Sequence, residues 1–459
     1  MSSQNSSPTA LGKADIKKLL IEYSLPAIIG MMAASLYNII DRIFIGHAMG
    51  ELALSGLAVA FPLMNLAAAF GTLVGIGGAS LVSIKLGQRD KEGATKVLGN
   101  VVVLNTIVGI SFSLVGLYFI DEILFFFGAS PNTIDYTRDF MEIILYGNVI
   151  THLFFGLNNI MRSSGYPRKA MITTLLAVLV NIILAPIFIF GFGWEMRGAA
   201  TATVMAQFIA FFWVVAHFTH KCSIVRFQAG IFKLQKRIVK EILSIGMAPF
   251  ILNASACFVI ILINQSLREQ GEMLFQGGGD LAIGAYGIIN SLVMLIVMVV
   301  MGFTQGMQPI VGYNFGAKQN DRALQALKLT IKYVLIVTVS AFLVGQLFPS
   351  QLAMMFNPNE KLLDLSVSGM RIVMAAFPII GFQMIISNFF QSIGSAWKAI
   401  FISTTRQILF LIPLLLILPH YWGVNGVWMS MPISDVASML TAGALFYWEL
   451  KKWKKTSEL

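Results

Sequence analysis

Residues 170–190 read AMITTLLAVLVNIILAPIFIF, a run of 21 residues without a charged side chain. A helix of this length spans the roughly 30 Å hydrocarbon core of a bilayer. Similar runs recur along the whole chain of 459 residues, of which 57% are hydrophobic and 12% charged. Soluble proteins average about 25% charged residues. The composition therefore predicts an integral membrane protein and excludes a soluble multidomain enzyme and a disordered chain.

Twelve apolar runs are separated by polar breaks, which fits twelve helices of about 20 residues and leaves no room for a soluble domain. The runs lack the alternating polarity of membrane barrel strands. The predicted fold class is an all-α integral membrane protein with twelve transmembrane helices. The runs lie near 22–46, 56–84, 97–120, 139–161, 170–190, 198–218, 241–267, 282–312, 328–349, 369–392, 399–418 and 426–449.

Lysine and arginine are distributed unevenly over the connections between the runs. If the N-terminus and the even-numbered connections share one side, that side holds 25 of the 32 lysines and arginines. The positive-inside rule assigns this side to the cytoplasm. We therefore predict a multi-pass protein of the cytoplasmic (inner) cell membrane with both termini in the cytoplasm. These loops also account for the net charge of +10, so we expect no nucleic-acid partner.

The two halves of the chain resemble each other at an offset of 229 residues. LGQRDKEGA, which contains Gly87, matches FGAKQNDRA, which contains Gly316, and MRSSGYPRKA matches FQSIGSAWKA. Six helices per half make the halves parallel repeats, an arrangement typical of secondary transporters that bind substrate between the halves. The predicted division is an N-terminal six-helix lobe at 1–220, a cytoplasmic linker at 221–240 and a C-terminal six-helix lobe at 241–459. The linker is either an amphipathic segment on the membrane surface or a charged tether.

Asp41 lies inside the first apolar run, in SLYNIIDRIFIG. A carboxylate at the centre of a span costs about 2.5–3.5 kcal/mol on insertion scales, so such a residue is usually functional or paired. The rise of a helix places Asn181 of the fifth run and Thr203 of the sixth at the depth of Asp41. Tyr37 shares a helix face with Asp41. A carboxylate, an amide and a hydroxyl at one depth predict a site for a proton or a small cation.

Asp435 in the last run is a second buried acid, with functional and structural interpretations about equally supported. Arg406 in the eleventh run either neutralises it or faces a water-filled cavity. Together with Tyr37, these two residues are candidates for the substrate cavity. Pro26 removes a backbone hydrogen bond from the first helix and permits a bend, which is either a gating element or an ordinary kink.

Motifs of soluble enzymes are absent from the sequence. It contains no G-x-x-x-x-G-K-[ST] phosphate-binding loop. The five histidines are scattered, and Cys222 and Cys257 have neither metal-ligand nor disulfide spacing. We therefore expect no enzymatic activity, no cofactor and no metal site.

Five stretches together resemble the multidrug and toxic compound extrusion (MATE) family: LPAIIGMMAASLYNIIDRIFIGH, KLGQRDKEGA, RSSGYPRKA, VNIILAPIFIFGFG and RGAATATVMAQ. The resemblance covers nearly the whole chain. It implies two six-helix bundles around a V-shaped cavity, and the export of bulky organic cations and drugs in exchange for protons or sodium.

The resemblance also implies roles for individual residues. The family's ion-coupling cluster is matched by Asp41, Asn181 and Thr203. Pro26 matches a proline at which the first helix bends in some members, and Asn158 matches a pocket asparagine of the fourth helix. Ala185 departs from the pattern, because NIILAP stands where the family often has Asn-x-x-x-Asp-Pro. One ligand of the usual cluster is therefore missing.

The missing acid bears on the coupling ion. A sodium ion must replace its water shell with several oxygens, preferably more than one of them anionic. A proton needs one desolvated carboxylate, and Asp41 is the one that the predicted cluster retains. We therefore favour proton coupling. The alternative is sodium coupling, in which backbone carbonyl oxygens or Asp435 would bind the sodium ion.

The leading hypothesis is a multidrug efflux antiporter that acts as a monomer in the bilayer and exports amphipathic organic cations by alternating access. The alternative is a lipid-linked saccharide flippase of the same superfamily. Such a flippase is expected to line its cavity with several arginines for a pyrophosphate, whereas we place only Arg42 and Arg406 inside the membrane and Arg371 at its outer side.

Overall fold

The structure, a computed structural model of the chain, describes residues 8–221, 223–274, 278–355 and 360–457. Nearly all of these residues are helical, and no strand occurs among them. The all-α fold class is confirmed. The helices are α1 (Pro8–Lys13), α2 (Ile16–Met49), α3 (Glu51–Gly87), α4 (Lys91–Tyr118), α5 (Ile120–Phe126), α6 (Ile134–Ser163), α7 (Pro167–Pro186), the π-helix η1 (Ile187–Gly191), α8 (Glu195–Thr219), α9 (Lys236–Leu274), α10 (Gly278–Gly316), α11 (Asn320–Leu347), α12 (Pro349–Met354), α13 (Glu360–Met374), α14 (Phe377–Ser392), α15 (Ala396–Thr404), the π-helix η2 (Thr405–Leu411) and α16 (Ile412–Ser457).

Twelve spans can be counted in the described part of the chain. Ten helical segments are long and apolar enough to cross a membrane, and α13 with α14, bent by 51° at their junction, form an eleventh span. The tenth segment, Ala396–Lys452, contains 57 residues, which is roughly 85 Å of helix and far more than one bilayer needs. Gly423 interrupts it with a φ of 56°, a conformation that glycine adopts without strain. This break divides the segment into the two predicted runs.

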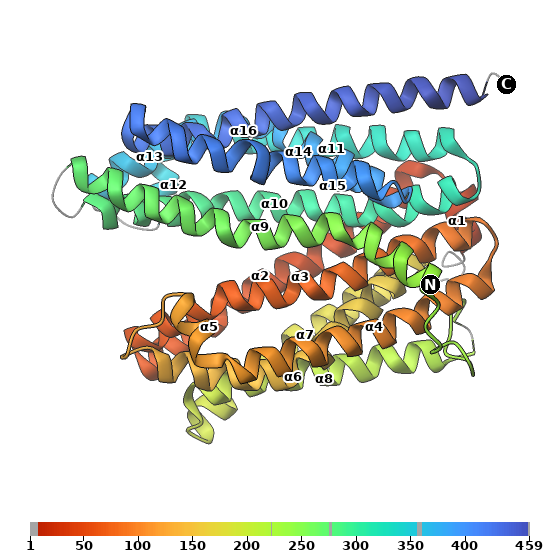
Figure 1. The fold of residues 1–459 in the computed structure, drawn as a ribbon, viewed down its shortest axis with the longest axis horizontal. Coiled ribbons are helices and arrows are strands. Elements are labelled where there is room, and N and C mark those ends of the chain that lie inside the picture. Colours follow the sequence, from red (N-terminus) through yellow and green to blue (C-terminus); the bar gives the residue numbers. More distant parts are fainter. Residues whose placement is uncertain (1–7, 222, 275–277, 356–359, 458–459) are drawn as a thin grey trace.

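Helices α2–α8 form one layer of the molecule and α9–α16 form the other (Figure 1). The short helix α1 and the last turns of α16 lie at the same end of the bundle (Figure 1). We call this end the termini side and the opposite end the far side. The two layers follow the order of the two sequence halves, as six-helix repeats predict.

Glycines of α3 and α10 bring the two halves into backbone contact at the termini side. A Cβ on Gly87 would lie 2.0 Å from the carbonyl oxygen of Tyr313, and a Cβ on Gly316 would lie 2.2 Å from the carbonyl oxygen of Ile84. The offset of 229 relates Gly87 to Gly316 and Ile84 to Tyr313, so the contact is reciprocal. Small residues permit this close approach of helix backbones. The halves are therefore repeats that close against each other at this end.

The leading turns of each half pack into the core of the other half. Ile16 and Leu20 of α2 are buried in one apolar cluster with Phe389 of α14 and side chains of α10 and α11. Ile242 and Ile245 of α9 are buried in a second cluster, with side chains of α3, α4 and α6. The first helix of each repeat thus crosses into the opposite bundle at the termini side.

The linker before α9 is docked on the first half. Its residues 223–235 contain no helix. The backbone N–H of Gln235 donates to Asn100 Oδ1 of α4 at 2.9 Å. A Cβ on Gly99 would lie 2.2 Å from the carbonyl oxygen of Ile231, which keeps the linker in backbone contact with α4. The segment is a tether fixed to the first half.

Candidate functional site

Asp41, Asn181 and Thr203 form a buried hydrogen-bonded cluster inside the first half. They come from α2, α7 and α8, and the three residues are 9%, 2% and 5% exposed. The amide of Asn181 lies between the other two, 3.1 Å from Asp41 Oδ1 and 3.0 Å from Thr203 Oγ1. The structure thus brings together the three residues that the sequence predicts at one depth.

The amide of Asn181 fits two hydrogen-bonding arrangements. With Asp41 ionised, the amide N–H donates to the carboxylate, and the amide oxygen accepts from Thr203 Oγ1 at 3.0 Å and from Thr203 N–H at 3.3 Å. With Asp41 protonated, the reversed amide accepts from the carboxyl group and donates to Thr203 Oγ1, which donates to the carbonyl oxygen of Ala199 at 3.2 Å. The Asn181 amide can therefore serve either protonation state of Asp41 as a hydrogen-bond partner in the same backbone.

Ala185 lies four residues after Asn181 on α7 and is fully buried in an apolar cluster with Ile45 and Leu63. It supplies no oxygen to the site. Among the described residues, no group of three or more His, Cys, Asp or Glu side chains could hold a metal ion. The cluster therefore offers one ionisable carboxyl group between neutral partners.

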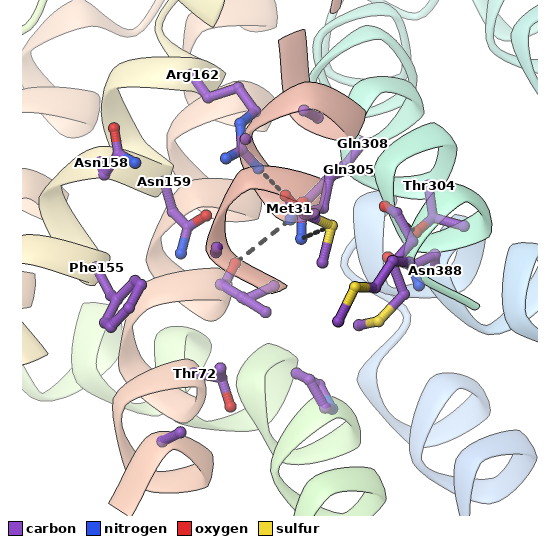
Figure 2. A pocket seen from close by; sticks show the side chains of 18 of the residues that line it. Met31, Thr72, Phe155, Asn158, Asn159, Arg162, Thr304, Gln305, Gln308 and Asn388 are labelled. Carbon is purple, nitrogen blue, oxygen red and sulfur yellow. Dashed lines mark hydrogen bonds between the residues drawn. The ribbon is translucent and has the colours of Figure 1, made fainter. Parts of the chain in front are cut away.

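A cavity of about 370 Å³ lies between the two halves, which is the size of site that holds a drug-sized molecule. Helices α2, α3, α6 and α7 contribute to its wall from the first half, and α9, α10, α14 and α15 from the second. Figure 2 shows amide, hydroxyl and thioether groups from both halves around it. Its polar and sulfur-bearing walls include Asn38, Asn158, Asn159, Gln305, Gln308, Gln391, Met31, Met301 and Met384.

Of the residues predicted for the cavity, Asn158 is among the described residues that line it, and Tyr37, Asp435 and Arg406 are not. Pro26, predicted as a bend of the first helix, also lines the cavity. The described residues that line the cavity include no Asp or Glu, so neither buried acid faces it.

The buried Asp435 and the partly exposed Arg406 form an ion pair within the second half. Arg406 Nε donates to Asp435 Oδ1 at 2.7 Å, and Ser434 Oγ donates to the carbonyl oxygen of Arg406 at 2.6 Å. Arg406 is the second residue of η2, whose wide turns interrupt the eleventh span. Arg406 thus neutralises Asp435, which was one of its two predicted roles.

Breaking this pair should destabilise the second half. We expect Arg406→Met to lower the free energy of unfolding by about 3–5 kcal/mol, because Asp435 is left buried and unpaired. The double variant Arg406→Met, Asp435→Leu should recover most of the loss, because it removes both charges. Thermal unfolding of the purified variants in detergent measures the difference. A double variant as unstable as the single one would contradict this account.

Arg162 is the site residue that the sequence analysis misses. The fourth run ends at 161, which assigns Arg162 to a cytoplasmic connection, yet α6 continues to Ser163 and Arg162 lines the cavity. It donates to Gln305 Oε1 of α10, across the two halves (Figure 2). The repeat carries a signal for it, because the offset of 229 pairs Arg162 with Gln391, and both line the cavity.

Comparisons with known proteins agree with this architecture. The MatE family model matches residues 26–187 and 244–417, once in each half. The chain is 26% identical over 435 residues to the multidrug export protein MepA of Staphylococcus haemolyticus (strain JCSC1435). The match covers 95% of this chain and 94% of that protein. The chain is also 26% identical over 438 residues to MepA of Staphylococcus aureus (strain NCTC 8325 / PS 47), with the same coverage.

Solved structures share the fold over the full length. A MATE protein crystallised in the bent conformation matches with a TM-score of 0.92 at 24% identity, covering 99% of this chain and 100% of that chain. An outward-facing multidrug resistance MATE transporter matches with a TM-score of 0.89 at 24% identity, covering 98% of both chains. The fold is therefore the V-shaped fold of MATE transporters. Because the family model covers most of both halves, the chain belongs to the MatE family, the multidrug and toxic compound extrusion transporters.

Proposed function

We propose that the chain exports amphipathic organic molecules, cations among them, across the cytoplasmic membrane in exchange for protons. The observation that carries the proposal is the buried cluster of Asp41, Asn181 and Thr203, which has hydrogen-bond partners for both protonation states of Asp41. A group that gains and loses a proton at membrane depth is what proton coupling requires. The cavity between the halves supplies the place for the cargo.

The composition of the cluster favours a proton over sodium. A sodium ion binds best to several oxygens, more than one of them anionic, and Ala185 leaves Asp41 as the single carboxylate of the cluster. Protonation of Asp41 removes its charge and reverses the donor and acceptor roles of Asn181. We propose that this change favours the orientation of the cavity from which the cargo leaves.

Transport in this proposal is alternating access between the two halves. The contact of Gly87 and Gly316 with the opposite backbone closes the termini side. We place the termini side in the cytoplasm, as the positive-inside rule predicts, so the cavity of this structure opens outward. The flippase alternative is less well supported, because the described wall of the cavity holds a single arginine, Arg162.

The orientation has its own test. The background variant lacks Cys222 and Cys257. Lys236 is exposed, and a cysteine that replaces it should stay unlabelled when intact cells are treated with an impermeant thiol reagent. A cysteine at exposed Asn132, between α5 and α6 on the far side, should be labelled and serves as the control. Labelling at position 236 with protection at 132 would reverse the topology.

The coupling ion is tested with purified protein in proteoliposomes. We expect efflux of a cationic dye such as ethidium when a pH gradient alone is imposed, and no efflux when a sodium gradient alone is imposed. A dye fluorescence assay with each gradient collapsed separately measures this. Efflux that follows the sodium gradient in the absence of a pH gradient would overturn proton coupling.

A further inference from the structure

The charges around the cavity are unbalanced. Arg162 is the single permanently charged side chain in the described wall, and this wall contains no Asp or Glu. The hydrogen-bond partner of Arg162 is the neutral Gln305, whose own Nε2 donates to Met31 Sδ at 3.5 Å. A guanidinium in the wall of a cavity is solvated there by water or by an anion. Arg162 is therefore suited to bind an anionic group of a ligand.

The geometry leaves donors of Arg162 free for that partner. A guanidinium has five N–H donors in a planar fork that matches the two oxygens of a carboxylate. Gln305 occupies one of them, and among the described residues no carboxylate lies within ion-pair distance. Figure 2 shows Arg162 beside Gln305 and Met31, where α6 of the first half meets α10 of the second.

A second unused donor lies at the equivalent position of the other repeat. Gln391 of α14 corresponds to Arg162 at the offset of 229, lines the same cavity and is 3% exposed. Its Nε2 has no hydrogen-bond partner. A buried donor without a partner costs about 1–3 kcal/mol, and a bound acceptor removes that cost. The residues that line the cavity thus include an unused donor in each half.

An unused acceptor lies one helical turn from Arg162. Asn158 precedes it by four residues on α6, so the two side chains share a face of the helix and are separated by about 6 Å along the axis. Asn158 Nδ2 donates to Thr174 Oγ1 at 3.1 Å, while Asn158 Oδ1 has no partner. The wall therefore offers a cationic donor and, one turn away, a neutral acceptor.

We propose that the cavity recognises amphipathic carboxylates: Arg162 and Gln391 bind the carboxylate, and Asn158 accepts from an N–H group of the same molecule. The apolar body lies against the methionines and Phe155 of the wall. The inference rests on the proposed export function and names the charged group that the exported molecules carry. It adds carboxylates and zwitterions to the predicted cationic cargo.

Equilibrium binding to the purified, detergent-solubilised protein tests the proposal without any transport step. The probes are N-dansyl-phenylalanine, which has a carboxylate and a sulfonamide N–H, and its methyl ester, which lacks only the charge. Dansyl fluorescence measures both dissociation constants. We expect the acid to bind at least about tenfold more tightly than the ester, because charge-assisted bidentate hydrogen bonds are the strong ones. Arg162→Gln should bring the acid to the affinity of the ester.

Two further variants separate recognition from structure. Arg162→Lys keeps the charge but loses the fork, so it should retain part of the preference for the acid. Arg168→Gln, which removes a largely exposed arginine at the start of α7, should leave the preference unchanged. Equal affinities of acid and ester in the wild-type protein would overturn the proposal. An equal loss of both affinities in Arg162→Gln would also overturn it, since Arg162 would then only join the two halves. Failure of gradient-driven efflux leaves this binding result unaffected, so the two proposals are tested independently.

Discussion

Asp41→Asn is expected to reduce gradient-driven efflux to the background level of empty liposomes, the largest functional effect of any change we propose. Asparagine has nearly the shape of aspartate and can hydrogen-bond to Asn181, so the buried cluster should persist. The asparagine amide does not take up a proton at neutral pH, so the cluster can no longer change between a charged and a neutral state. Dye efflux from proteoliposomes under an imposed pH gradient measures the loss, and equilibrium dye binding should remain within about threefold of wild type.

The matched control is Asp139→Asn. Asp139 is an acid of α6 on the far side, partly exposed and bound to Arg197 at 2.8 Å, outside the buried cluster. This variant should transport at the wild-type rate. Efflux by Asp41→Asn that still responds to the pH gradient would move the proton site to another residue.

The double variant Gly87→Ala, Gly316→Ala is expected to open the termini side and to slow efflux by more than tenfold. Each new Cβ would lie 2.0–2.2 Å from a backbone carbonyl oxygen of the opposite half, a contact that side-chain motion does not relieve. Overpacking costs about 1–3 kcal/mol per site, so two sites shift the balance between closed and open states by tenfold or more. Spin labels at Lys91 and Asn320, the starts of α4 and α11, report the separation by pulsed electron paramagnetic resonance.

Gly287→Ala on α10 is the control for this change, because nothing lies within 4 Å of the added Cβ. It should preserve both the label distance and the efflux rate. If the double variant keeps the wild-type distance distribution, the glycine contact is not what closes this side.

Long apolar runs made most of the fold predictable. The twelve spans follow from run length, and the repeat follows from the matching loops around Gly87 and Gly316. The cluster of Asp41, Asn181 and Thr203 was predictable because helix rise fixes the depth of a residue in a span. The depth of a residue in the membrane is therefore the structural property that can be predicted most directly from such a sequence.

The wall of the cavity was not predictable in the same way. Depth leaves open which face of a span points toward the other half, and that choice depends on packing between helices distant in sequence. Asp435 and Arg406 therefore look like cavity residues in the sequence but form an ion pair with each other inside the second half. Arg162 looks like a loop residue in the sequence, because the apolar run ends at residue 161. In the structure α6 continues to Ser163, so Arg162 is part of the helix.

The exchange of leading turns between the halves has a consequence for biogenesis. Ile16 and Leu20 leave the ribosome long before the partners that bury them, which begin with side chains of α10 and extend to Phe389, 369 residues after Leu20. Until then the start of α2 lacks its packing partners, and the start of α9 meets its own at once in the completed first half. The two repeats are thus alike in shape but unequal in the order of assembly, because the start of α2 is packed only after the second repeat has been made.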